Sequence, residues 1–68
     1  MTLVQTIETA AHNILCERAV NGSCRFRQWF YVGSGFAINP EVEKAIHYGV
    51  LRGKSATEIA EEIYTPYS

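Results

Sequence analysis

The chain has 68 residues, of which 47% are hydrophobic and 12% aromatic. This length fits one domain over residues 1–68, and its apolar content suffices for one core, which excludes wholesale disorder. Six lysines and arginines stand against seven glutamates, giving a net charge of −1. General nucleic-acid or membrane-surface binders usually carry a clear basic excess, so the charge balance argues against both classes.

No targeting segment is predicted. The first residues contain neither a basic stretch nor a continuous apolar run, so we expect no signal peptide. The longest unbroken apolar run, residues 29–32, is far shorter than the roughly 20 residues that a membrane span needs. We therefore expect a soluble, cytoplasmic protein without membrane contact, in which Cys16 and Cys24 are free thiols.

Residues 2–20 predict an amphipathic helix. Thr2 can cap its start, and Asn21-Gly22 supplies the left-handed stop that commonly ends helices. Its apolar face, with spacings of three and four residues, comprises Leu3, Val4, Ile7, Ala11, Ile14 and Leu15. The solvent-facing side comprises Glu8, His12, Asn13 and Glu17.

Residues 24–38 are rich in aromatic and β-favouring side chains, and Gly33-Ser34-Gly35 interrupts them. This pattern predicts a β-hairpin with a three-residue turn. Period-two alternation then places Arg25, Arg27, Trp29 and Tyr31 on one face of the first strand. A short helix beginning at Ser23 is the alternative, because Phe26, Trp29 and Phe30 also have helical spacing.

Two helices are predicted in the C-terminal part. Asn39 and Pro40 form a start signal for a helix that runs to Arg52, and Gly53 closes it. Ser55 and Glu58 have the spacing of a capping box and open a last helix, which Thr65-Pro66 ends.

The predicted fold class is α+β: a small single domain with an N-terminal helix, a β-hairpin and a C-terminal helical pair, with an all-α domain as the alternative. The predicted core residues are Leu3, Ile7, Ile14, Leu15, Phe26, Phe30, Val42, Ile46, Val50, Ile59 and Ile63.

Residues 39–63 also carry a family resemblance. A helical pattern is followed by Gly53 and Ser55 in a turn, and then by the run Thr57-Glu58-Ile59-Ala60. This order resembles the first two helices of the DNA-binding domains of LuxR-type regulators and of sigma-factor region four. The resemblance implies a helix-turn-helix and a DNA partner. In those families a recognition helix follows, whereas here Tyr64-Thr65-Pro66 follows, and we expect no recognition helix.

Arg25, Arg27, Trp29 and Tyr31 form the candidate binding cluster. Arginines beside aromatic rings can contact phosphates and stack on bases. Trp29 and Tyr31 could instead cover a helix, with the arginine stems extended around them. Tryptophan, tyrosine and arginine are also enriched at protein-binding hot spots, and the balanced charge favours a protein partner. We therefore predict that these four residues contact another protein.

Metal, cofactor and catalytic sites have little support in the sequence. His12 and Cys16 share a helical face, and Cys24 and His47 could complete a zinc set, but no C-x-x-C pair is present. The sequence contains no aspartate, no nucleophile elbow and no phosphate-binding Walker loop. We expect no metal, no cofactor and no enzyme activity.

The leading functional hypothesis is a non-enzymatic protein-interaction module. Small size, the aromatic–arginine cluster and an acidic C-terminal helix are typical of phage- or mobile-element-type modulators or inhibitors of a host protein complex. The expected partner is another protein, and a homodimer is an alternative. The second hypothesis is a helix-turn-helix-like transcriptional regulator whose nucleic-acid contacts come from Arg25, Arg27, Arg52 and Lys54.

Overall fold

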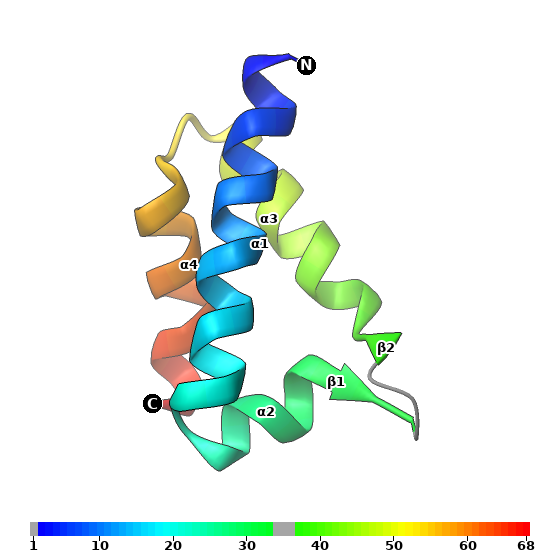
Figure 1. The fold of residues 1–68 in the computed structure, drawn as a ribbon. Helices are drawn as coiled ribbons and strands as arrows, with labels where there is room; N and C mark the ends of the chain where they lie inside the picture. The colour runs from blue at the N-terminus through cyan, green and yellow to red at the C-terminus, as the bar shows by residue number, and fades with distance from the viewer. Residues whose placement is uncertain (1, 34–36) are drawn as a thin grey trace.

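A computed structural model of the chain describes residues 2–33 and 37–68. In these ranges its elements are α1 (Leu3–Asn21), α2 (Cys24–Phe30), β1 (Tyr31–Val32), β2 (Ala37–Ile38), α3 (Pro40–Leu51), α4 (Ala56–Tyr64) and the 3₁₀ turn η1 (Thr65–Tyr67). Helices α1, α3 and α4 pack against one another pairwise, while α2 and the hairpin close the end opposite the N-terminus (Figure 1). None of the helices in the described ranges is long and apolar enough to cross a membrane.

The predicted N-terminal helix is confirmed, but Gly22 follows its end for a different reason from the one predicted. Thr2 accepts a hydrogen bond from the Gln5 backbone N–H, and the Gln5 side chain accepts one from the Thr2 N–H, which completes a capping box. The predicted left-handed glycine is wrong, because Gly22 has φ −103°. Glycine is needed there for space: a Cβ atom would lie 2.6 Å from the Arg18 carbonyl oxygen and 2.6 Å from the Tyr64 hydroxyl.

The predicted strand over residues 24–30 is wrong, and the alternative helix beginning at Ser23 is correct. The Ser23 hydroxyl accepts a hydrogen bond from the Arg25 N–H at 3.1 Å and caps α2. Phe26 and Phe30, four residues apart, are fully buried on the inner side of this helix. Their helical spacing and tertiary packing outweigh the strand propensity of the aromatic residues, because propensity is a weak determinant beside burial.

The predicted hairpin is present but short. Strands β1 and β2 pair antiparallel, with Tyr31 opposite Ile38 and Val32 opposite Ala37. Residues 34–36, which include most of the predicted Gly33-Ser34-Gly35 turn, lie outside the described residues. The predicted order of helix, hairpin and helical pair is confirmed, and the domain is mostly helical.

The predicted signals for the C-terminal helices are confirmed. Asn39 caps α3 by accepting from the Glu41 N–H at 3.0 Å, and Pro40 is its first residue. Gly53 adopts φ +77° just beyond the end of α3. Ser55 caps α4 by accepting from the Glu58 N–H, but the Glu58 carboxylate accepts from the Ser55 hydroxyl and not from the backbone.

The core lies where α1, α2, α3 and α4 meet. Its buried residues are Ala11, Leu15, Ala19, Phe26, Phe30, Val42, Ile46, Ile59 and Ala60. Ile7, Ile14, Val50 and Ile63 are half-buried against it. Leu3 is a wrong core prediction, because the first turn of α1 extends beyond the loop that joins α3 to α4 (Figure 1). Ala11, Ala19 and Ala60 were not among the predicted core residues; their small side chains allow close helix packing.

Helices α3 and α4 approach each other closely at Gly49. A Cβ atom added there would lie 2.6 Å from Cγ1 of Ile59, a buried side chain. Alanine normally stabilises a helix interior by about 1 kcal/mol relative to glycine, but overpacking costs roughly 1–3 kcal/mol. The two effects have opposite signs, and the clash should be the larger.

We therefore expect Gly49→Ala to lower the melting temperature by roughly 5–10 °C, measured by circular dichroism. Lys44→Ala, on the exposed side of the same helix, is the matched control and should leave the melting temperature nearly unchanged. A higher melting temperature for Gly49→Ala would contradict the close packing of α3 on α4.

Candidate functional site

The four predicted contact residues of α2 and β1 do not share a strand face, because α2 is a helix. Arg25 and Arg27 are both exposed, but two residues along a helix correspond to about 200° around its axis. Arg27 turns back and donates from Nη2 to Cys24 Sγ at 3.6 Å. The two guanidinium groups therefore point in different directions.

The two aromatic members of the cluster support the fold. Trp29 is half-buried and stacks on Tyr67 of η1, with ring centroids 4.9 Å apart and planes at 19°. Tyr31 is half-buried with its ring edge-on to Phe30 at 5.0 Å. Their rings therefore cover part of the core, which is close to the alternative interpretation that they cover a helix. Partner contact by the four residues stays a prediction.

The predicted nucleic-acid residues of the α3–α4 connection have partners within the chain. The Arg52 guanidinium lies over the Tyr48 ring at 5.5 Å. Lys54 forms an ion pair with Glu62 of α4. Helix α4 also carries the exposed Glu58 and Glu61. The helix pair that the resemblance implies is present, but its second helix has an acidic surface.

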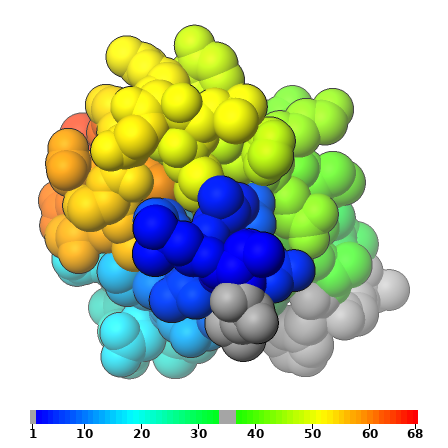
Figure 2. Space-filling view, turned by 90° about the horizontal axis from the view of Figure 1, so that it is seen from above, coloured from blue at the N-terminus to red at the C-terminus, as the bar shows by residue number. Residues whose placement is uncertain are grey.

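Four of the six large apolar side chains that are exposed among the described residues lie at the N-terminal end of α1 and the C-terminal end of α3. They are Leu3 (75% exposed), Leu51 (71%), Tyr48 (62%) and Val4 (44%). The start of α1 lies beside the end of α3 when the molecule is seen from above (Figure 2). We call these four residues the apolar end. A small domain gains nothing in its own stability from exposing them.

A polar contact fixes how α1 and α3 align below the apolar end. His47 Nδ1 lies 3.4 Å from Glu8 Oε2, and the two helices run in opposite directions (Figure 1). Val4 lies four residues before Glu8 on α1, and Leu51 lies four residues after His47 on α3. The same helical faces therefore carry Val4, Leu51 and the Glu8–His47 pair. Tyr48 instead lines the groove between α3 and α4.

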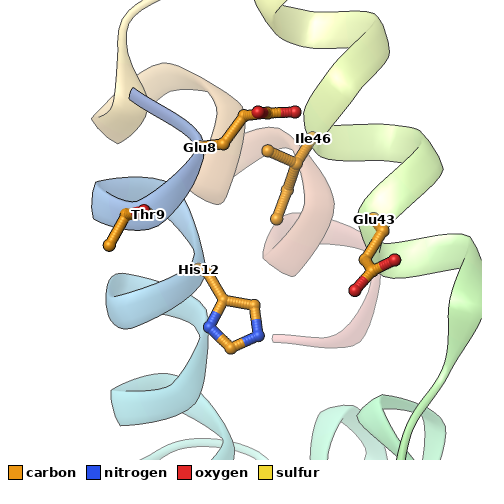
Figure 3. Close-up of a pocket in the computed structure, with 5 residues that line it drawn as sticks. All are labelled: Glu8, Thr9, His12, Glu43 and Ile46. Atoms are coloured by element: carbon orange, nitrogen blue, oxygen red, sulfur yellow. The ribbon is translucent and has the colours of Figure 1, made fainter. Parts of the chain in front are cut away.

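A groove of about 340 Å³ lies further along the same two helices. Its lining residues are Glu8, Thr9, His12, Glu43 and Ile46. The His12 ring points from α1 into the space between the helices, and Glu43 faces this space from α3 (Figure 3). We call the exposed surface formed by Leu3, Val4 and Leu51, the Glu8–His47 pair and this groove the α1–α3 face.

The groove does not have the properties of a metal centre or a thiol active site. Across residues 2–33 and 37–68, no group of three or more His, Cys, Asp and Glu side chains is arranged to hold a metal ion. His12 Nδ1 lies 3.6 Å from Cys16 Sγ. Burial raises the pKa of the Cys16 thiol, so this thiol is protonated at neutral pH and is a poor nucleophile.

From the sequence, Glu8 was predicted only as a solvent-facing residue, and His12 and His47 were considered together only as zinc candidates. A repeated spacing could have indicated that these residues lie together. Glu8 and His12 are four residues apart, and so are Glu43 and His47. In an antiparallel helix pair, two such motifs place each glutamate opposite the other motif's histidine. The missing information was which helices pair.

The comparisons with known proteins provide no relative: no family model, curated protein or solved structure matches this chain.

The Trp29 packing leads to a test. We expect Trp29→Ala to lower the free energy of unfolding by roughly 2 kcal/mol, since half of a large ring and its stacking on Tyr67 are lost. Urea unfolding followed by circular dichroism measures this change. Arg25→Ala, an exposed residue of the same helix, should change the free energy by less than about 0.5 kcal/mol. Equal effects of the two variants would mean that Trp29 is not a packing residue.

Proposed function

We propose that this chain is a non-enzymatic protein-interaction module that docks its partner on the α1–α3 face. The observation that carries the proposal is the apolar end, where two leucines, a valine and a tyrosine are exposed on two adjacent helix ends. Contiguous exposed apolar side chains bordered by polar ones are the usual signature of a protein-binding surface.

The rest of the chain's surface supports this location. Val20 and Val32 are the other large apolar residues that are exposed among the described residues, and they lie in separate elements. Single exposed apolar residues are common in proteins and need no partner. The apolar end differs because four such residues come from two adjacent helix ends.

A DNA-binding regulator, as the resemblance of residues 39–63 implies, is the alternative. The α3–α4 corner supports it, because its capping residues match the expected ones. The charge of α4 opposes it, since Glu58 would face phosphates and Lys54 is already paired with Glu62. The proposal therefore favours a protein partner.

The docking face can be tested with peptides selected from a displayed random library on the wild-type chain. We expect the enriched peptides to lose at least roughly tenfold in affinity for Leu3→Gln/Leu51→Gln, because the exposed leucines are their apolar contacts. Val20→Gln is the matched control, since Val20 is equally apolar, 64% exposed and near the opposite end of α1. Fluorescence anisotropy gives the dissociation constants.

The leucine variant should fold normally, because glutamine is a good helix former and both sites are exposed. Circular dichroism melts verify this. Peptides that bind the variant as tightly as wild type would contradict the proposed face. Loss of binding in Arg25→Ala/Arg27→Ala alone would move the contact to α2.

The DNA alternative has its own expected outcome. A fluorescein-labelled random duplex should show no rise in anisotropy with the chain at low salt, since the net charge is −1 and Lys54 is paired. Binding that weakens steeply with salt, and that disappears when Arg25, Arg27, Arg52 and Lys54 are changed to glutamine, would favour the regulator instead.

A further inference from the structure

We propose that the partner segment docked on the α1–α3 face is an amphipathic helix with a lysine or arginine that enters the groove between Glu8 and Glu43. This inference rests on the proposed function and specifies the chemistry of the partner. It starts from the size of the apolar end. A standard stable interface buries about 800 Å² on each partner, which is more than four partly exposed side chains supply. A partner must therefore extend beyond them.

The alignment of the two helices shows where this extension lies. From Val4 and Leu51, the next positions on the same helical faces are Glu8 and His47, and the next after those are His12 and Glu43. At 1.5 Å per residue, the groove lies roughly 6–12 Å from the apolar end. One to two turns of a docked helix span this distance.

The charge of the groove selects the partner's side chain. Among the described residues that line it are two carboxylates, Glu8 and Glu43, and no lysine or arginine. An ammonium or guanidinium group between them would form charge-assisted hydrogen bonds, which are the stronger kind. Glu8 keeps acceptor capacity beside His47, because a carboxylate accepts several hydrogen bonds. The aliphatic stem of the entering side chain would pack on Ile46.

Size and symmetry exclude other occupants. At about 340 Å³ the groove is near the lower limit of small-molecule sites, and it is open to solvent, so a side chain suits it better than a free ligand. A second copy docked through the same face would bring its own Glu8 and Glu43 toward these carboxylates. Repulsion between like charges makes a basic segment of another protein the better partner.

The test uses the peptides selected on the wild-type chain. We expect them to carry a lysine or arginine one to two helical turns from their apolar anchor. For one such lysine peptide, Glu8→Gln/Glu43→Gln should weaken binding at least roughly tenfold, the size expected for lost charge-assisted hydrogen bonds. Glu41→Gln on exposed α3 surface is the matched control for charge and should change binding less than about twofold.

Acetylation of the peptide's lysine separates specific contact from general attraction. It removes the charge, so the acetylated peptide should bind wild type and Glu8→Gln/Glu43→Gln equally weakly. If the free and acetylated peptides bind with equal affinity, the proposal of a basic side chain in the groove is wrong. If Leu3→Gln/Leu51→Gln still abolishes binding in that case, the proposed docking face remains supported. Binding insensitive to the leucine substitutions would overturn the proposed function itself. A dimer in sedimentation that these substitutions dissociate would replace the basic segment with a second copy.

Discussion

The packing of Tyr64 against the α1–α2 corner is the constraint on which the rest of the fold depends. The Tyr64 hydroxyl accepts a hydrogen bond from the Ser23 N–H at 3.0 Å, and its ring meets Phe26 edge-on at 5.0 Å. Gly22 leaves the space for this ring. The contact joins residues 41 positions apart and holds α4 along α1. With α4 fixed there, Gly49 lets α3 pack closely on Ile59.

This packing makes the two ends of the domain chemically different. The aromatic residues that the chain could use for binding are largely collected around Phe26, where Trp29, Tyr64 and Tyr67 surround it. They close the core at the end where α2 lies. At the opposite end Leu3 and Leu51 are 75% and 71% exposed. The proposed interaction surface therefore lies at the apolar end, where contact with a partner leaves the packing of the core unchanged.

Local signals made the helix ends predictable, whereas the identity of α2 depended on tertiary contacts. Thr2, Asn39 and Ser55 act through hydrogen bonds within a few residues, so the sequence alone contains their effect. Residues 24–30 fit both an alternating and a helical pattern. These residues form a helix because a helix buries Phe26 and Phe30 together against neighbouring helices. The local sequence pattern does not show which helices become those neighbours.

The candidate site was less predictable because it depends on which helices pair and where they end. Leu3 follows the apolar pattern of α1 and was expected in the core. With 19 residues α1 is roughly 28 Å long, whereas α3 with 12 residues is roughly 18 Å. From the contact between Glu8 and His47, α1 extends five residues back to Leu3 and α3 extends four residues on to Leu51, so most of the surplus length of α1 lies at the other end of the pair. Beyond this contact, the apolar periodicity that buries Leu15 continues onto an exposed apolar surface at Leu3.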